Sequence, residues 1–320
     1  MELVKHVIGK ELDEFEKKFA DNVKGSNPLL DRIMRFIIRR KGKQMRPMFV
    51  FLSAKIAGSI KESTYRAAAL IELLHTATLV HDDVVDNAMV RRNFFSINAL
   101  WKNKIAVLVG DYLLAKGLLL SIENDDVPIL RITSRAVKEM SEGELLQMEK
   151  ARKLDIKEDI YFEIIRAKTA SLLSSACSAG AHSATGDPEI AEHFRLFGEK
   201  VGIAFQIKDD LFDYGEDNVG KPTGIDIKEK KMTLPLIYTL QHADRETKRK
   251  IIYIIKNQST DRRKVNEVIA LVRGSGGIEY ALQKMNEYHA AAIELLHRYP
   301  DTPERQAMEQ LVSYVIERKY

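Results

Sequence analysis

The sequence predicts an all-α fold, and three observations support this. The 320-residue chain holds only eight prolines, so long stretches such as 48–127 and 236–299 lack the strongest helix breaker. Within those stretches apolar residues recur three or four positions apart, which is the spacing of one helical face. The two-residue alternation of a half-buried strand is nowhere sustained.

Helix starts can be assigned along the chain. Residues 1–19 alternate charged and apolar residues at helical spacing and lack the apolar core of a signal peptide, so we expect a first helix there. Asn27 followed by Pro28 predicts a second start, because a capping side chain precedes proline at the first helical position. Asp187 followed by Pro188 predicts another.

Two stretches show the helical spacing most clearly. One contains Leu70, Leu73, Leu74, Ala77 and Val80, and the other contains Ile251, Ile254 and Ile255. No segment has the Ser/Gly content of a linker and no repeat of 20–50 residues occurs, so we expect one domain over residues 1–320.

Composition indicates a globular protein, with 45% hydrophobic and 30% charged residues. The formal net charge is only +4, from 50 basic and 46 acidic residues, which gives no global field for nucleic acid. The single cysteine, Cys177, excludes an intramolecular disulfide and suits the reducing cytoplasm, where we expect the protein. The longest run without Asp, Glu, Lys or Arg, 169–186, is too polar to cross a bilayer, so we expect no integral membrane segment.

Two acidic clusters share the pattern DDxxD: Asp82, Asp83 and Asp86, and Asp209, Asp210 and Asp213. On a helix the first and last aspartate of each cluster share a face. Like charges at this spacing cost ~0.2–0.5 kcal/mol, so we expect a cation to compensate. Oxygen ligands without cysteine indicate Mg²⁺, which typically binds one or two carboxylates together with substrate phosphates. A solvated acidic turn is the alternative for either cluster taken alone.

Basic segments accompany both clusters. GKQMRP occupies residues 42–47, Arg91 and Arg92 follow the first cluster, and a Gly/Pro-punctuated loop at 220–231 carries four lysines after the second. Arginine and lysine together suit a diphosphate, and the loop has the composition of a mobile cationic lid. For residues 39–46 alone, a nucleic-acid or anionic-membrane patch is an alternative that the neighbouring acidic clusters weigh against.

Taken in order, these motifs resemble the trans-isoprenyl diphosphate synthase family. The similarity spans residues 42–233 and includes LLHTATLVHDDVVDNAMVRR at 73–92, FQIKDDLFDY at 205–214 and GKPTGIDIKEKKMT at 220–233. The DDVVD form is most similar to long-chain, octaprenyl-type members. The resemblance implies a helical bundle around a central cavity and a homodimer.

The resemblance also implies residue roles. Mg²⁺, or Mn²⁺ in its place, would be held by Asp82, Asp86 and Asp209, with Asp83, Asp210 and Asp213 as further ligands or as support. Isopentenyl diphosphate would be bound by Lys43, Arg46, His75 and Arg92. The allylic diphosphate would be bound by Arg91, Lys168, Thr169, Gln206, Lys221 and Lys231, of which Lys168 and Lys221 are also expected to act in catalysis. Lys230 is not excluded in place of Lys231.

The implied reaction condenses isopentenyl diphosphate onto an allylic diphosphate, making a long, octaprenyl-like product for quinone side chains that passes to the membrane. Released diphosphate would serve as the base, so no catalytic His or Glu is required. The small residues Ala77 and Thr78, five and four positions before Asp82, predict an open tunnel for the growing chain.

Four other functions fit parts of the pattern. A shorter-chain farnesyl or geranylgeranyl diphosphate synthase differs only in product length. A class I terpene cyclase has no use for a second cationic pocket. A metal phosphohydrolase of the HD type, suggested by His81, Asp82 and His75, leaves the second cluster unexplained. A non-catalytic subunit of a heteromeric synthase would be expected to lack some of these aspartates or lysines, and none is missing.

Overall fold

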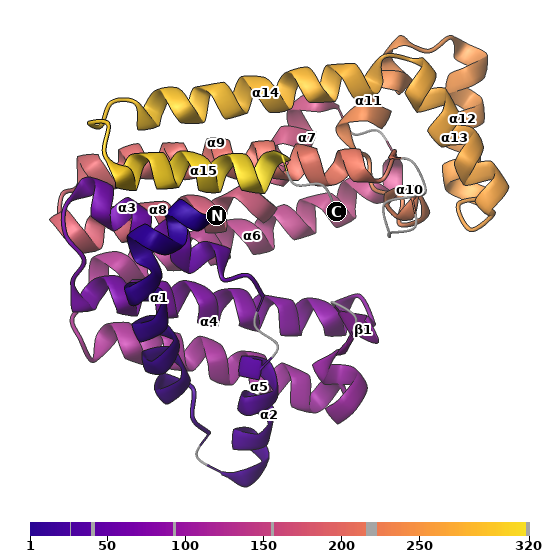
Figure 1. Cartoon of the computed structure of the whole chain (residues 1–320). Coiled ribbons are helices and arrows are strands. Elements are labelled where there is room, and N and C mark those ends of the chain that lie inside the picture. The colour runs from indigo at the N-terminus through magenta and orange to yellow at the C-terminus, as the bar shows by residue number, and fades with distance from the viewer. Residues whose placement is uncertain (26, 40–41, 92–93, 155–156, 216–222, 318–320) are drawn as a thin grey trace. The chain divides into compact units, whose positions relative to one another are not determined.

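A computed structural model describes residues 1–25, 27–39, 42–91, 94–154, 157–215 and 223–317, and within these ranges it confirms the all-α prediction (Figure 1). Only the backbone is described for Arg91, Arg152, Lys153 and Glu317. In chain order the elements are α1 (Glu2–Asn22), α2 (Pro28–Arg39), α3 (Met45–Ala57), α4 (Glu62–Val85), β1 (Val90–Arg91), β2 (Phe94–Phe95), α5 (Ile97–Ile122), α6 (Val127–Lys153), α7 (Glu158–Ile165), the π-helix η1 (Arg166–Ala170), α8 (Ser171–Thr185), α9 (Pro188–Phe212), α10 (Ile225–Lys228), α11 (Leu234–His242), α12 (Arg245–Asn257), α13 (Arg262–Gly274), α14 (Gly277–Leu296) and α15 (Pro303–Glu317).

The two predicted capping sites begin helices as expected. Asn27 Oδ1 accepts a hydrogen bond from the Leu30 amide at 2.9 Å, and α2 starts at Pro28. Asp187 Oδ1 accepts the amide of Glu189 at 2.8 Å, and α9 starts at Pro188. In both cases a polar side chain satisfies a backbone donor that has no partner inside the helix.

A short hairpin was not predicted. β1 and β2 pair antiparallel, with Val90 opposite Phe95 and Arg91 opposite Phe94. Each strand has two residues, which is too short for a two-residue alternation to be visible in the sequence.

The chain forms two compact units, which are described separately. Unit 1 contains residues Met1–Val137, Ser174–Arg195 and Tyr299–Gln310, and unit 2 contains Lys138–Leu173, Leu196–Arg298 and Leu311–Tyr320. The expectation of a single domain over residues 1–320 stays a prediction.

The core of unit 1 is built on α4 and α5, which pack along each other. Leu73, Ala77 and Val80 of α4 are buried against Val109 and Leu113 of α5. The helical spacing noted in the sequence therefore marks the face of α4 that packs against α5.

Helix α5 carries more apolar surface than its packing buries. It is long and apolar enough by composition to cross a membrane, although the core helix of a soluble protein passes the same test. Leu108 is 67% exposed and Leu119 is 51% exposed. The expectation of no membrane-spanning segment stays a prediction.

The later helices of unit 2 contribute to its core. Helix α11 packs on α14, and α12 and α13 pack on each other. Ile251, Ile254 and Ile255 of α12 are each at most 2% exposed, as their spacing predicted.

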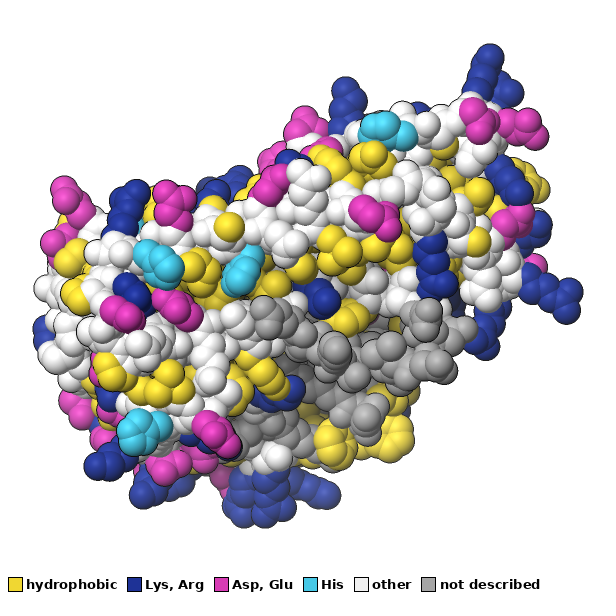
Figure 2. Space-filling model, turned by 45° about the horizontal axis from the view of Figure 1, so that its top comes forward, with side chains coloured by type: hydrophobic (Ala, Val, Ile, Leu, Met, Phe, Trp, Pro, Cys, Tyr) yellow, Lys and Arg dark blue, Asp and Glu magenta, His cyan; other side chains and the backbone are white. Residues whose placement is uncertain are grey.

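On the face that Figure 2 shows, basic and acidic side chains are intermixed, so any anion-binding site has to be local.

Candidate active site

The first acidic cluster ends α4 in unit 1. Asp82 and Asp83 occupy the last turn, and Asp86 follows directly, with its amide donating to the Asp82 carbonyl at 2.8 Å. The helical hydrogen bonding therefore continues to Asp86 and keeps the predicted i,i+4 relation. Asp83 is only 4% exposed, whereas Asp82 is partly exposed and Asp86 exposed. The two aspartates predicted to bind the metal are thus the accessible ones.

Three of the residues predicted to bind isopentenyl diphosphate line one pocket of about 160 Å³ in unit 1: Lys43, Arg46 and His75. Lys43 and Arg46 come from the segment that enters α3, and His75 comes from α4. Arg92, the fourth, lies outside the described residues. The pocket combines cationic and imidazole donors, which suits an anionic ligand.

His81 lies apart from this pocket. Its ring nitrogen Nε2 is 3.2 Å from the Val107 carbonyl of α5, and a side chain at Gly110 would collide with the ring. His81 therefore packs on α5, while His75 lines the pocket formed with Lys43. The two histidines do not form the paired site that a metal phosphohydrolase of the HD type would require.

The second acidic cluster ends α9 in unit 2 and borders a pocket of about 230 Å³, here called the α9 pocket. The residues of interest that line it are Tyr161, Lys168, Thr169, Gln206, Asp209, Asp210, Asp226 and Lys231. Four residues predicted to bind the allylic diphosphate thus lie together with two aspartates of the second acidic cluster. Lys221 is outside the described residues, as is the side chain of Arg91.

A chain of hydrogen bonds fixes the polar groups of the α9 pocket. Thr169 Oγ1 donates to Gln206 Oε1 at 2.8 Å, and Gln206 Nε2 donates to Asp210 Oδ1 at 2.8 Å. The hydroxyl of Tyr161 donates to Asp210 Oδ2 at 2.7 Å. Thr169 and Gln206 therefore orient Asp210. Tyr161 was not predicted, because it lies 49 residues before Asp210 in no recognisable motif.

Three acidic side chains, Asp209, Asp210 and Asp226, line the α9 pocket. Burial, and after it the charge of Asp226, raise the pKa of Asp210 to about 7, although hydrogen bonds from Tyr161 and Gln206 act against this. Burial likewise raises the pKa of Asp226 to about 6, against the opposing charge of Lys231. A bound cation would stabilise the charged form of both carboxyl groups and so lower their pKa values.

This donor set fits a hard divalent cation. Among the described residues no three His, Cys, Asp or Glu side chains form a complete metal site. Mg²⁺ does not require three protein ligands, because it retains several waters and takes substrate phosphates as further ligands.

Asp213 has a different role from its neighbours. It is 8% exposed, and its carboxylate accepts the backbone amides of Ile225 at 2.7 Å and Asp226 at 3.2 Å, at the start of α10. Burial raises its pKa, while these backbone hydrogen bonds lower it. Asp213 thus anchors the start of α10, within the segment that was predicted to be a lid.

The structure distinguishes Lys230 from Lys231, the two lysines of that segment that were candidates for binding the allylic diphosphate. Lys231 lines the α9 pocket, and its Nζ atom lies 3.4 Å from Asp226 Oδ1. Lys230 is exposed and donates to the Lys256 carbonyl at 3.3 Å. Lys168 also lines the pocket and pairs with Glu144 of α6, a partner that the sequence did not indicate.

Lys168 and Thr169 lie in the π-helix η1, a form often found at functional sites. Gly202 of α9 allows the close approach, since a Cβ there would lie 2.6 Å from the Ala170 Cα atom. Gly202→Ala is therefore expected to lower the free energy of unfolding by about 1–3 kcal/mol and to reduce activity by displacing Thr169. Thermal unfolding and steady-state rates would measure the two effects.

Gly9→Ala is the matched control, because nothing lies within 4 Å of a Cβ at that helical position. It is expected to stabilise the protein by about 0.5–1 kcal/mol. Equal stability of the two alanine variants would contradict the close packing at η1.

Comparison with known proteins agrees with this site. Residues 27–272 match the polyprenyl synthetase family. The chain belongs to this family. The match includes both acidic clusters and every basic residue that the sequence analysis singled out.

Relatives and solved structures in the family extend over almost the whole chain. The all-trans-nonaprenyl-diphosphate synthase (geranyl-diphosphate specific) of Rhodobacter capsulatus is 35% identical, over 97% of this chain and 96% of its own. Octaprenyl diphosphate synthase of Escherichia coli strain K12 is 32% identical, over 99% of both chains. The crystal structure of a Caulobacter crescentus CB15 polyprenyl synthase with calcium and isoprenyl diphosphate is 30% identical, with a TM-score of 0.91 over 100% of this chain and 98% of that one.

Proposed function

We propose that the protein condenses isopentenyl diphosphate onto an allylic diphosphate and makes a long-chain polyprenyl diphosphate. The observation that carries the proposal is the α9 pocket, where Lys168, Gln206 and Lys231 meet Asp209 and Asp210. Such a set suits a diphosphate and its metal ion. Family membership and the long-chain products in the relatives' names support the same activity.

The proposal includes dependence on Mg²⁺. Asp82 and Asp86 would bind Mg²⁺ in unit 1, and Asp209 would bind Mg²⁺ in unit 2. When bound, Mg²⁺ neutralises the charge that develops on the departing diphosphate. The raised pKa values of Asp210 and Asp226 support a cation near Asp209. The calcium and isoprenyl diphosphate in the Caulobacter structure agree with this chemistry in a relative.

The protein's own residues bind and orient the two substrates. Lys168 and Lys231 attract the allylic diphosphate, and Thr169 and Gln206 keep Asp210 in place beside it. Lys43, Arg46 and His75 hold isopentenyl diphosphate. This arrangement increases the rate of the reaction by positioning the reacting groups and excluding water.

The proposal also includes a homodimer, in agreement with the exposed apolar face of α5. Val107, Leu108 and Leu119 are between 42% and 67% exposed, and burying such residues stabilises association. Light scattering should give twice the mass of one chain, and Leu108→Asp should lower that mass. A monomeric wild-type protein would contradict this part of the proposal.

The activity is tested by incubating the purified protein with both diphosphates, Mg²⁺ and a mild detergent, followed by product sizing. We expect a long polyprenyl diphosphate, and no product when either substrate is omitted. A cyclised product made from the allylic substrate alone would identify a terpene cyclase instead.

The pocket containing Lys43 predicts a selective effect of Arg46→Ala. A hydrogen bond to a charged group contributes about 1.5–3 kcal/mol, so the KM for isopentenyl diphosphate should rise roughly 10–150-fold. The KM for the allylic substrate serves as the internal control and should change little. If only the allylic KM rose, the two substrate pockets would be assigned the wrong way round.

A further inference from the structure

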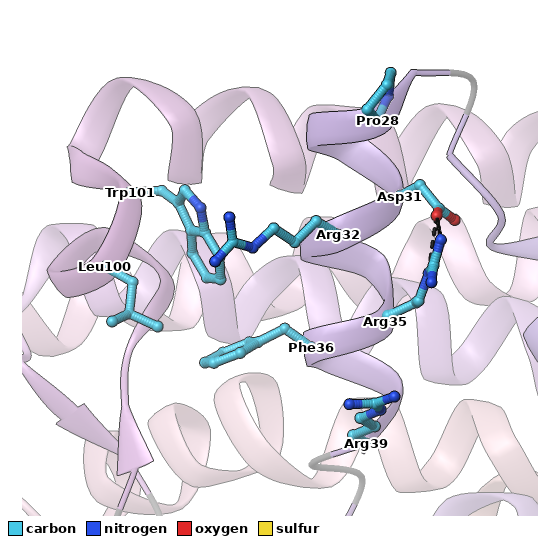
Figure 3. Close-up of a pocket in the computed structure, with 8 residues that line it drawn as sticks. All are labelled: Pro28, Asp31, Arg32, Arg35, Phe36, Arg39, Leu100 and Trp101. Atoms are coloured by element: carbon cyan, nitrogen blue, oxygen red, sulfur yellow. Dashed lines mark hydrogen bonds and ion pairs between the residues drawn. The ribbon is translucent and has the colours of Figure 1, made fainter.

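A pocket of about 690 Å³ lies between α2 and the first turn of α5 in unit 1 (Figure 3). We call it the α2–α5 groove and define it by Arg32, Arg35, Phe36, Arg39, Leu100 and Trp101. None of these residues belongs to the acidic clusters or to the predicted diphosphate sites. The groove is therefore separate from the residues proposed above to bind substrates and metal.

One side of the groove is cationic. Arg32, Arg35 and Arg39 are spaced three and four residues apart on α2 and are all exposed, so they form one stripe. Arg35 pairs with Asp31, but neither Arg32 nor Arg39 forms an ion pair with any residue that the structure describes. Within the described part of the chain, two guanidinium groups therefore remain available to an external anion.

The arginines are not needed to fold α2. Ile33 and Met34, on its opposite face, are each 1% exposed and belong to the hydrophobic core of unit 1. Packing of that face holds the helix in place and leaves the arginine stripe directed outward. Replacing these arginines is therefore expected to change binding rather than folding.

The other side of the groove is apolar. The rings of Phe36 and Trp101 meet edge to face, with centroids 4.9 Å apart, and Arg32 extends toward Trp101 (Figure 3). Leu100 is 43% exposed beside them, and Leu29, at the start of α2, is 47% exposed. A free phosphate ion would need only the cations, so the apolar wall indicates an amphiphilic partner.

Backbone geometry adds to this local arrangement. Lys102 has φ 73° and ψ 159°, a conformation that residues other than glycine rarely adopt. It interrupts α5 directly after Trp101 and sets the first turn apart from the rest of the helix. The interruption gives that turn its own direction, with Trp101 against Phe36.

We propose that the α2–α5 groove docks the protein on the surface of an anionic phospholipid bilayer. Headgroup phosphates accept hydrogen bonds from Arg32 and Arg39, while Trp101 and Leu100 lie at the interfacial level, where tryptophan is favoured. Nucleic acid fits less well, because the exposed side chains of Leu29 and Leu100 gain nothing from a phosphate backbone. The proposal stands independently of the enzyme's reaction.

Vesicle sedimentation tests the proposal without any activity assay. The full-length protein is mixed with phosphatidylcholine vesicles that contain or lack phosphatidylglycerol, at low salt. We expect binding only to the anionic vesicles and weaker binding as salt is added. Arg32→Gln/Arg39→Gln should lower the affinity roughly 30-fold, because two cations near the surface are lost.

Arg245→Gln/Arg249→Gln on α12 is the matched control, since it removes two exposed arginines elsewhere and should leave vesicle binding unchanged. Circular dichroism melts of both variants report folding. Equal loss of binding in both variants, or equal binding to neutral vesicles, would overturn the proposal. So would a lower oligomeric mass of Arg32→Gln/Arg39→Gln, or loss of DNA-duplex binding with unchanged vesicle binding.

Discussion

Replacing Asp82 or Asp209 with alanine is expected to lower turnover by roughly three orders of magnitude. Each is a partly exposed carboxylate at the end of a long helix, and Asp209 borders the α9 pocket. Losing the anchor for a metal ion removes several kcal/mol of charge stabilisation, and each ~1.4 kcal/mol is tenfold in rate. Steady-state rates at saturating substrate and a Mg²⁺ titration would measure the effect.

Asp13→Ala is the control for Asp82 in unit 1 and Asp159→Ala for Asp209 in unit 2, because each removes an exposed aspartate that belongs to neither cluster. Both should retain wild-type turnover. Addition of EDTA to the wild-type protein should abolish activity, and excess Mg²⁺ should restore it. Undiminished turnover in EDTA would refute the metal assignment, whatever the mutants show.

Helix starts were predictable because the signal is local. Asn27 and Asp187 each satisfy backbone donors two or three residues away, so sequence neighbours alone specify the cap. The α4 face that packs against α5 was predictable for a similar reason, since helical geometry places Leu73, Ala77 and Val80 on one side. Such features depend on residues within a few turns of each other.

Features that depend on distant residues were not predictable. Tyr161 and Glu144 contact Asp210 and Lys168 across 49 and 24 residues, and no motif relates these pairs. The function of Asp213 was also concealed, because an aspartate in DDxxD resembles a metal ligand. Only the fold shows that its carboxylate binds the backbone of α10.

The structure distinguishes the two residues predicted to control chain length. Ala77 is fully buried in the cluster that α4 forms with α5. Thr78 is only partly buried, and its hydroxyl donates to the His75 carbonyl at 2.8 Å. Thr78 also precedes Asp82 by four residues, so both lie on one face of α4. A hydrocarbon chain that runs back from Asp82 along this helix meets Thr78 first.

Thr78→Phe is therefore expected to shorten the product to farnesyl or geranylgeranyl length while the first condensation remains largely intact. Ala77→Phe should shorten it as well, but should also lower the free energy of unfolding by about 1–3 kcal/mol, because a phenyl ring overpacks the contact with Leu73 and Val109. Thr78→Val is the matched control, since it keeps the side-chain volume and loses only the hydroxyl. Chromatography of radiolabelled products together with thermal melts separates these effects. A full-length product from folded, active Thr78→Phe would show that the growing chain follows another route.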